Sequence, residues 1–464
     1  MTADPDTPVS ATQAVPLVVD LDGTLCRTDT LHEGLLSLAA RDPVALLKVP
    51  GWLREGRAGL KAHLADQSVI PVDALPLNPD VIALIEAARA EGRPTALVSA
   101  ADHRQVTAVA EATGLFDEAY GSAEGTNLKG AEKARFLTGH YGEKGFDYVG
   151  DSRADLPVWE AARQAITVGA DAGLRRAAEA ANPEVTHIAP PGNRGKAMLR
   201  AMRPHQWSKN LLLFLPLLAA HDLSALLSVV LAFAAFCLTA SAVYVLNDLV
   251  DLEADRAHPR KRNRPFAAGD LTAAEGVMLA GALLLGALLL SVLTGSIRLL
   301  IVLALYFVAT FTYSLWLKRK LMIDVMALAG LYTIRIVAGG AAAAIDLSPW
   351  MLAFSMFLFL ALAAVKRQTE LVDLETTGRS GAGRAYKVGD LPVIQSLAIT
   401  SGQAAVLVLA LYITSDDVQR LYAYPALLWL ICPLLLYWVL RMVIKAHRGE
   451  MTDDPILFAA TDKI

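Results

Sequence analysis

The stretch LNDLVDLEADRAHPRKRNRP, residues 246–265, follows directly on a long apolar run of the chain. It places Asp248, Asp251 and Asp255 at the end of that run. A carboxylate within or beside a membrane is energetically unfavourable, so such a residue marks a functional site by default. The stretch therefore predicts a membrane-embedded bundle with a charged site at one edge. The basic residues that follow the carboxylates are Arg256, Arg260, Lys261, Arg262 and Arg264.

The composition divides the chain into two domains. Of its 464 residues, 54% are hydrophobic, which excludes one ordinary soluble domain. Residues 1–195 have a mixed polar composition, whereas long apolar runs separated by short polar loops begin at about residue 208. The fold predicted is a soluble α/β domain followed by an all-α polytopic membrane bundle. The three cysteines are too far apart in the sequence to indicate a metal-binding pair.

The apolar runs predict a bundle of eight or nine membrane-spanning helices. A spanning helix needs about 20 mostly apolar residues. The first candidate is short and interrupted by Pro216, and the final residues DDPILFAATDKI (453–464) resemble the approach to a ninth helix. The eight candidate spans are 208–222, 224–246, 274–294, 297–317, 321–344, 348–365, 392–413 and 421–441.

Lysine and arginine are concentrated in alternate loops of this bundle. The loops 247–273, 318–320 and 366–391, with the tail as far as Arg448, carry sixteen of these residues. The loops on the opposite side carry only Arg298 and Arg420. Basic residues favour the cytoplasmic side of a membrane. We therefore expect a multi-pass protein of a bacterial inner membrane, with the soluble domain and the charged site facing the cytoplasm.

The spacing of the acidic residues predicts a magnesium site. On a continuous helix, Asn247, Asp251 and Asp255 are four residues apart and Asp248 lies on roughly the same face. Carboxylates so close together repel unless a cation lies between them, and Mg²⁺ prefers oxygen ligands and usually brings substrate phosphates. The arginines just beyond, Arg262 and Arg264 among them, are expected to bind the remaining phosphate oxygens. The alternative is a solvated helix end of mixed charge.

Further charged residues lie at the predicted cytoplasmic side or within the bundle. Lys366, Glu370 and Asp373 share a helix face with Arg367 beside them, and a flexible glycine-rich loop follows. The alternative is a membrane anchor followed by an ordinary loop. Lys209, in RPHQWSKN (203–210), is either a phosphate ligand or an interfacial anchor. An unpaired arginine within a span is unfavourable, so Arg335 is expected to face a carboxylate or an anionic substrate.

Two stretches resemble the UbiA-type prenyltransferase superfamily, over about residues 200–464. These are NDLVDLEADRAHPRKRNRP (247–265) and YSLWLKRKLMIDV (313–325). RPHQWSKNLLLFLPLLA (203–219), IRIVAGG (334–340), KRQTEL (366–371) and RGEMTDDPILFAATD (448–462) are similar to the branch that makes polyprenyl-phosphoryl phosphoribose. Most of the superfamily transfers a prenyl group to an aromatic ring and uses a second DxxxD motif, which this chain lacks.

The resemblance implies a Mg²⁺-dependent transfer of 5-phosphoribosyl from phosphoribosyl diphosphate to a polyprenyl phosphate such as decaprenyl phosphate. The product would be a precursor for cell wall polymers in family relatives. One or more Mg²⁺ ions would be bound by Asp248, Asp251 and Asp255. An aromatic prenyltransferase of quinone biosynthesis is the alternative. The residues predicted to bind substrate and its phosphates are Lys209, Asn247, Arg262, Arg264, Lys318, Arg335, Lys366, Arg367 and Glu370.

The soluble half predicts a parallel sheet with polar residues at its strand ends. PLVVDLDGTLCRTDT (16–30) is an apolar strand that runs into Asp20 and Asp22, and PTALVSAAD (94–102) leads to Ser99. FDYVGDSRADLPV (146–158) ends in Gly-Asp-Ser, and TNLKGAEKARFL (126–137) offers Lys129. Ala-rich helical stretches alternate with these strands, as in sheets with crossover helices. Active sites lie at the strand ends of such sheets.

This ordered set resembles the haloacid dehalogenase-type phosphatase superfamily, over about residues 14–190. The resemblance implies that Asp20 is the nucleophile and that Asp22 is the general acid and base. Ser99 and Lys129 would hold the phosphoryl oxygens. One Mg²⁺ would be bound by Asp151 with Asp20 and the Asp22 carbonyl, with Asp155 supporting it. Residues from about 30 to 80 read as a small helical cap that sets specificity.

These elements predict a bifunctional enzyme. The expected parts are a disordered N-terminus (1–14), a phosphatase domain (15–190), a linker with an interfacial helix (191–207) and the transferase domain (208–464). The phosphatase is expected to remove the 5-phosphate from the lipid product, although an idle docking or regulatory domain is the alternative. The expected partners are phosphoribosyl diphosphate, a polyprenyl phosphate and the membrane. Nothing indicates nucleic-acid binding, and formation of a homo-oligomer stays open.

Overall fold

The chain forms two compact units in the computed structural model. The structure describes residues 14–451 and Phe458, except for residues 55, 68–71, 124–126, 190–191, 222, 378–384, 417 and 419–421. One unit comprises Met1–Ala201 and Asp248–Leu279, and the other comprises Met202–Asn247 and Ala280–Ile464. The predicted disordered N-terminus, apart from Ala14, and the predicted approach to a ninth helix, apart from Phe458, lie outside the described residues.

A six-stranded parallel sheet forms the centre of the first unit, which confirms the predicted α/β fold. The strand order is β3-β2-β1-β4-β5-β6. Strand β1 lies between β2 and β4, with Val19 beside both Leu97 and Val149. The carboxyl ends of β1 and β4 therefore lie next to each other at the same edge of the sheet. The strands are β1 (Leu17–Val19), β2 (Thr95–Asp102), β3 (Glu118–Ser122), β4 (Asp147–Gly150), β5 (Ala165–Val168) and β6 (Val185–Ile188).

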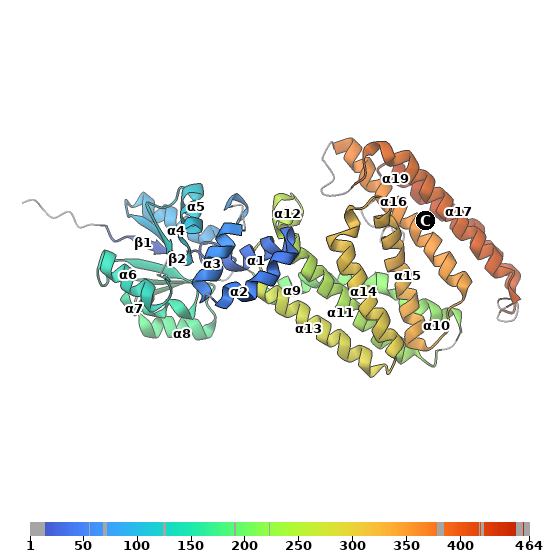
Figure 1. Ribbon diagram of the computed structural model, residues 1–464, viewed down its shortest axis with the longest axis horizontal. Coiled ribbons are helices and arrows are strands. Elements are labelled where there is room, and N and C mark those ends of the chain that lie inside the picture. Colours follow the sequence, from blue (N-terminus) through green and yellow to red (C-terminus); the bar gives the residue numbers. More distant parts are fainter. Residues whose placement is uncertain are drawn as a thin grey trace, which may run out of the picture. The chain divides into compact units, whose positions relative to one another are not determined.

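Alternate side chains of the central strand face two separate helical layers. Leu17 and Val19 point into a core with α4 and α5, whereas Val18 points into a core with α6, α7 and α8. Successive side chains of a strand point to opposite faces, so the apolar run of β1 is buried on both faces of the sheet. Helices lie on both sides of the sheet (Figure 1). The covering helices are α4 (Pro79–Ala90), α5 (His103–Thr113), α6 (Ala131–Tyr141), α7 (Leu156–Ala161) and α8 (Ala172–Ala181).

The predicted cap is a small helical layer with its own core. It contains α1 (Thr30–Arg41), α2 (Val49–Arg54) and α3 (Gly56–Gln67). Leu38, Trp52 and Leu64 are buried together there. Asp29 begins α1, because its carboxylate accepts hydrogen bonds from the first-turn amides of Leu31 and His32. Helix α9 (Arg194–Met202) follows the sheet at the end of the soluble sequence.

The segment Asp248–Leu279 belongs to the first unit, although the sequence places it inside the predicted transferase domain. It contains α12 (Leu252–Ala257) and the short turn η5 (Lys261–Asn263). Within this segment we call residues 248–264 the acid-rich segment. Helix α11 ends at Val250 and α12 begins at Leu252, so Asp251 lies at a break between the two helices.

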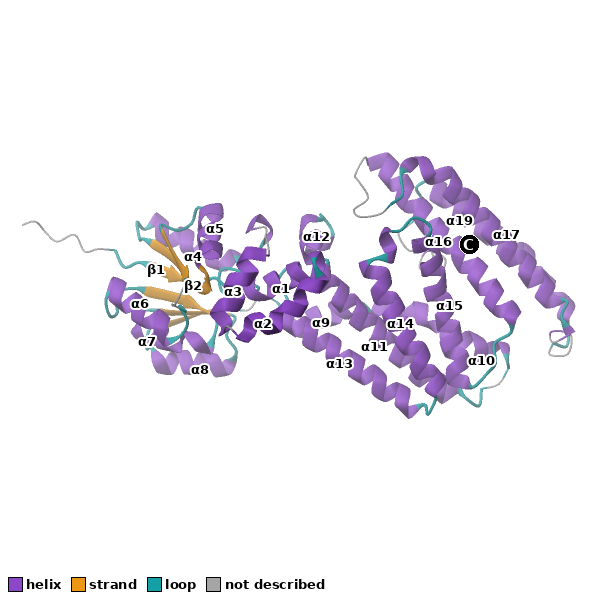
Figure 2. Ribbon diagram, viewed as in Figure 1, coloured by secondary structure: helices purple, strands orange, loops and turns teal. Residues whose placement is uncertain are grey.

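The second unit is built of helices (Figure 2). Seven helices of the described chain are long and apolar enough to cross a membrane. Two of them, α11 and α13, extend into the first unit by one or two turns at one end. Besides the short α10 (Leu215–Ala219), the seven helices are α11 (Leu226–Val250), α13 (Ala273–Leu293), α14 (Ile297–Leu315), α15 (Ile323–Ala343), α16 (Pro349–Thr377), α17 (Leu391–Ile413) and α19 (Ile431–His447).

The predicted first span, 208–222, is not one of these seven, so the count of eight or nine is higher than the structure gives for its described part. The region forms a 3₁₀ stretch, η4 (Pro204–Phe214), followed by the short α10. Proline lacks the amide hydrogen that an α-helix needs, and Pro216 lies where the two pieces meet. Gly339 of α15 lets η4 approach closely, since a Cβ there would lie 2.0 Å from the Leu213 carbonyl oxygen.

Candidate functional site

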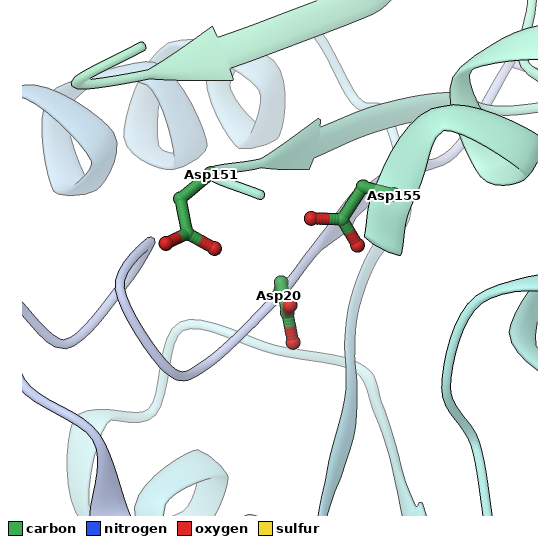
Figure 3. A group of neighbouring side chains, drawn as sticks. All are labelled: Asp20, Asp151 and Asp155. Atoms are coloured by element: carbon green, nitrogen blue, oxygen red, sulfur yellow. The ribbon is translucent and has the colours of Figure 1, made fainter. Parts of the chain in front are cut away.

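Three carboxylates gather at the shared edge of β1 and β4 in the first unit. Asp20 directly follows β1 and Asp151 directly follows β4, and the Asp20 amide donates to the Val149 carbonyl oxygen at 3.0 Å. Asp155 follows in the turn η3 (Arg153–Asp155). Oxygen atoms of Asp20, Asp151 and Asp155 lie within 4.8 Å of one another (Figure 3). The structure thus brings together three of the residues that the sequence predicted.

The lysine that reaches this cluster is Lys133 rather than the predicted Lys129. Lys133 Nζ lies 3.0 Å from Asp20 Oδ1, and its side chain is 2% exposed. Lys129 is exposed at the surface just before α6. Lys133 and the buried Leu137 are four residues apart on α6, so they share its inward face. This four-residue spacing is the feature of the sequence that could have indicated that Lys133 faces inward.

A buried hydrogen-bond network fixes Lys133 and Asp155. Lys133 donates to the Tyr148 hydroxyl at 2.8 Å, and Tyr148 donates to Asp155 Oδ1 at 3.0 Å. Burial raises the pKa of Tyr148 well above its ordinary value, so the phenol remains a donor at neutral pH. The Ser152 amide donates to the other Asp155 oxygen at 3.1 Å. The sequence reading missed Tyr148, because this strand residue carries no motif.

Asp22 has the properties of a proton donor. Burial and the nearby Asp29 carboxylate raise its pKa to about 7, and a general acid works best with a pKa near the working pH. The Thr30 amide, at the start of α1, donates to Asp22 Oδ1 at 2.7 Å. Gly23 has φ +75°, and a Cβ there would lie 2.1 Å from Asp151 Oδ2. Only glycine lets this turn approach the carboxylate so closely.

Ser99 completes the predicted strand-end set. It is 1% exposed in β2, and its hydroxyl oxygen accepts a hydrogen bond from the Ala101 amide at 3.1 Å. Strand β2 is the parallel neighbour of β1. Ser99 therefore lies in the strand beside the one that leads to Asp20, where a phosphoryl oxygen ligand is expected.

The carboxylate cluster has the chemistry of a divalent-cation site. Burial raises the pKa of Asp20, and burial together with Asp20 and Asp155 raises the pKa of Asp151 well above its ordinary value. Lys133 is the buried cation among them. Magnesium prefers carboxylate oxygens and water as ligands, and a divalent ion would offset the remaining negative charge. Asp20, Asp151 and Asp155 therefore fit Mg²⁺, whereas the Asp22 carboxylate does not join the cluster.

In the acid-rich segment, an arginine bridges two of the three predicted aspartates. Arg264 Nη1 lies 3.1 Å from Asp248 Oδ1 and 2.5 Å from Asp255 Oδ2. Asp248 and Asp255 are buried, whereas Asp251 is half-buried at the helix break. Burial raises the pKa of Asp255, and the Arg264 charge opposes this rise. The predicted continuous helical face is therefore wrong, because the helix ends before Asp251.

Two other predicted residues of this region have different surroundings. Asn247 donates from its side-chain amide to the Ser314 hydroxyl at 2.8 Å, within the second unit. Arg262 is exposed in η5, and the described part of the first unit gives its side chain no ion pair. Arg264 is the predicted phosphate ligand whose contacts with these carboxylates are seen in the described part of the first unit.

Arg335 lies inside the second unit, as predicted, but its contacts are neutral. Its Nε donates to Asn210 Oδ1 at 2.9 Å and its Nη2 donates to the Tyr306 hydroxyl at 3.0 Å. The guanidinium also lies over the rings of Tyr306 and Tyr332, a favourable cation–π arrangement. Within the described chain, no carboxylate pairs with Arg335. The contact of Arg335 with an anionic substrate stays a prediction.

Arg367 belongs to a buried acidic and aromatic cluster in the second unit. Arg367 Nη2 lies 2.7 Å from Asp324 Oδ2, and the two side chains are 1% and 0% exposed. Arg367 also pairs with Glu370, and the Tyr386 hydroxyl donates to Asp324. The sequence reading missed Asp324 and Tyr386, which lie 43 residues before and 19 residues after Arg367 in the chain.

The other predicted phosphate ligands of the second unit are lysines. Lys209, Lys318 and Lys366 are all half-buried. Lys366 precedes the buried Arg367 in α16, and Lys318 lies in the turn η6 (Leu317–Arg319). The glycine-rich loop expected after Glu370 lies mostly within residues 378–384, outside the described residues.

Comparison with known proteins gives two family matches. The UbiA prenyltransferase family model matches residues 211–455. The model for haloacid dehalogenase-like hydrolases matches residues 17–160. The first match covers more than half of the chain and contains the acid-rich segment, while the second contains the strand-end carboxylates.

Three relatives illustrate the range of similarity. Uncharacterized protein y4nM of Sinorhizobium fredii is 38% identical over 97% of this chain and 88% of its own length. Nodulation protein NoeC of Azorhizobium caulinodans is 37% identical over 56% of this chain and 86% of its own length. Decaprenyl-phosphate phosphoribosyltransferase of Mycolicibacterium smegmatis is 41% identical over 199 residues, which are 41% of this chain and 61% of that enzyme.

Proposed function

We propose that this chain, which belongs to the UbiA prenyltransferase family and carries a haloacid dehalogenase-like domain, makes a ribosylated lipid in two steps. The first step transfers 5-phosphoribosyl from phosphoribosyl diphosphate to a polyprenyl phosphate. The second removes the 5-phosphate. The observation that carries the first step is the 41% identity with a decaprenyl-phosphate phosphoribosyltransferase, together with the absence of a second DxxxD motif.

The transferase chemistry requires that a sugar–diphosphate bond break beside a lipid phosphate. An oxygen of the lipid phosphate attacks C1 of the ribose, the C1–O bond to diphosphate breaks, and C1 inverts. Diphosphate leaves with the bonding electrons. Mg²⁺, when bound, would offset the charge on the leaving diphosphate. Asp248, Asp251 and Asp255 are the residues that would hold it, and Asp248 and Asp255 would exchange the Arg264 guanidinium for the ion.

The basic residues are proposed to bind and orient the anionic substrates. Guanidinium groups suit this because they donate two parallel hydrogen bonds to phosphate oxygens. Arg335 is supported by its neutral surroundings, since an anion would supply the charge partner that its hydrogen bonds do not. The other residues proposed to bind substrate are Lys209, Asn247, Arg262, Arg264, Lys318, Lys366, Arg367 and Glu370.

The phosphatase chemistry uses the strand-end residues. Asp20 attacks the phosphorus of a phosphate ester and forms an aspartyl-phosphate, while Asp22 gives its proton to the leaving alcohol oxygen. Asp22 then takes a proton from water, which releases phosphate from Asp20. Lys133 and Ser99 hold phosphoryl oxygens. Asp20, Asp151 and Asp155 would hold Mg²⁺, which would offset the repulsion between the nucleophile and the phosphate.

We infer further that both sites face the cytoplasm of a bacterium, with the η4–α10 stretch crossing the membrane before α11 crosses back. The seven apolar helices and the UbiA match make the chain a polytopic membrane protein. The orientation is supported by the excess of lysine and arginine in alternate loops. Phosphoribosyl diphosphate is a cytoplasmic metabolite, so this orientation gives the enzyme access to its donor.

One assay tests the first step. Purified enzyme is incubated with Mg²⁺, labelled phosphoribosyl diphosphate and decaprenyl phosphate, and the label is followed into the lipid phase. We expect a labelled lipid that forms only when Mg²⁺ is present. Label that stays in water, together with activity on a prenyl diphosphate and an aromatic acid, would instead assign an aromatic prenyltransferase.

A further inference from the structure

A buried ion pair joins the cap of the soluble domain to the acid-rich segment within the first unit. Arg256 of α12 donates to both oxygens of Glu33 of α1, at 2.7 and 3.0 Å. The two side chains are 7% and 8% exposed. A planar guanidinium that meets a carboxylate with two bonds fixes orientation as well as distance. This α1–α12 ion pair therefore sets the position of α12 against α1.

Other contacts hold the same segment on the same domain. Arg256 Nε donates to the Ala267 carbonyl oxygen at 3.3 Å, so the buried arginine also holds the turn after η5. Gly269 has φ +73°, and a Cβ there would lie 2.7 Å from the Cβ of Arg27. The Arg41–Glu253 pair is about half exposed, where ion pairs contribute little. Among the described ion pairs between this segment and residues 1–201, Arg256–Glu33 is the one with both side chains buried.

Helix α1 also contacts the phosphatase site. The Thr30 amide, at its first residue, donates to Asp22 Oδ1 at 2.7 Å. Thr30 and Glu33 are three residues apart, which is about 5 Å along a helix. A single helical turn therefore connects the proposed general acid of the phosphatase to the ion pair that positions α12. Helix α12 carries Asp255, which contacts Arg264.

We propose that Glu33 is a positioning residue for the transferase, acting through Arg256 on the acid-rich segment. The soluble domain is then a structural part of the transferase as well as a phosphatase. Loss of Glu33 leaves Arg256 buried without its counter-charge, which disfavours the packed position of α12. The acid-rich segment becomes more mobile, and its aspartates bind the metal and the diphosphate less well. The expected effect on catalysis rests on the proposed function, whereas the positioning of α12 by Glu33 does not.

The test compares Glu33→Gln, Arg256→Gln and the double variant in the full-length protein. We expect each single variant to raise the KM for phosphoribosyl diphosphate about tenfold with a smaller change in kcat. The double variant should be no worse than the poorer single variant, because the two residues act as one pair. Glu33→Asp, which keeps the charge, should recover most of the activity. Multiplying effects, or wild-type kinetics in Glu33→Gln, would overturn the proposal.

Two controls separate positioning from general damage. Arg41→Gln removes the exposed pair and should leave the KM within about twofold. Arg104→Gln removes a second exposed pair, with Asp66 of cap helix α3, and should also leave the KM within about twofold.

A second measurement does not depend on the reaction. Amide hydrogen exchange of residues 248–279 should be at least about tenfold faster in Glu33→Gln than in the wild type, with helix α15 unchanged. If the wild type lacks transferase activity but this exchange difference appears, the proposed function fails and the positioning role survives. Unchanged exchange in 248–279 would overturn the positioning role itself. Faster exchange throughout the chain would contradict it as well, because the loss of Glu33 would then act on the whole fold and not on this segment.

Discussion

The strand-end site and the acid-rich segment both place aspartates close together, but they neutralise them differently. In the strand-end site, Asp20 receives a lysine from α6, more than a hundred residues away. In the acid-rich segment, Arg264 comes from the same loop, nine residues after Asp255. The first arrangement is fixed by the sheet and its helices. The second is local, and in the proposed function a Mg²⁺ ion with a diphosphate would take the place of Arg264.

Replacement of the nucleophile should give the largest effect. Asp20→Asn keeps the size of the side chain but cannot form the aspartyl-phosphate, so phosphatase activity should fall by at least about a thousandfold. The labelled lipid should then retain its 5-phosphate, which mass spectrometry of the lipid extract would detect. Equal amounts of the phosphorylated lipid in wild type and variant would show that this domain acts on another substrate.

Replacement of Lys133 should give the next largest effect, and comparison with Lys129 shows which of the two lysines acts in the phosphatase site. Lys133→Met leaves buried carboxylates without their cation and should reduce phosphatase activity about a hundredfold and stability by roughly 3–5 kcal/mol. Lys129→Met changes an exposed side chain and should alter either quantity little. The pair is compared by hydrolysis of an aryl phosphate and by thermal unfolding. A larger effect for Lys129 would restore the assignment made from the sequence.

Removal of the local cation in the acid-rich segment should have a smaller effect. Arg264→Gln removes the charge that bridges Asp248 and Asp255, so Mg²⁺ should bind more tightly while transfer slows about tenfold. The measurement is the Mg²⁺ dependence of label transfer. Arg260→Gln, an exposed arginine of the same loop, is the matched control. Weaker Mg²⁺ binding in Arg264→Gln would mean that the arginine supports the ion instead of standing in its place.

The sequence predicted the strand-end site better than the acid-rich segment for a physical reason. Parallel strands bring their carboxyl ends to one edge whatever lies between them, so Asp20 and Asp151 could be paired without knowing the loops. The aspartates near the membrane were predicted from helical periodicity, which holds only while the helix continues. The break at Asp251 removed that basis.

The sequence did not predict which residues from distant parts of the chain contact one another. Lys133 lies within helix α6 and outside the predicted motif residues, and only its place on the inward face of that helix indicates its role. Arg335 was expected to meet a carboxylate or an anion, whereas its direct partners are Asn210 and Tyr306, which lie 125 and 29 residues away. Neutral acceptors and aromatic faces can solvate a guanidinium, so the sequence did not determine which partner it would have.

The smallest activity effect is expected at the buried cluster around Asp324. Tyr386 donates to Asp324 and accepts from the Met322 amide at 3.0 Å. Tyr386→Phe leaves both groups without that partner, which should lower stability by about 1–3 kcal/mol. Arg367 still neutralises Asp324, so the charge balance holds and transfer should fall only a few-fold.

Tyr424→Phe, at a side chain that is 76% exposed, is the control and should change neither stability nor transfer. If Tyr386→Phe abolished transfer without loss of thermal stability, the hydroxyl would act on the substrate. This buried cluster would then take part in the reaction, as the acid-rich segment is proposed to do.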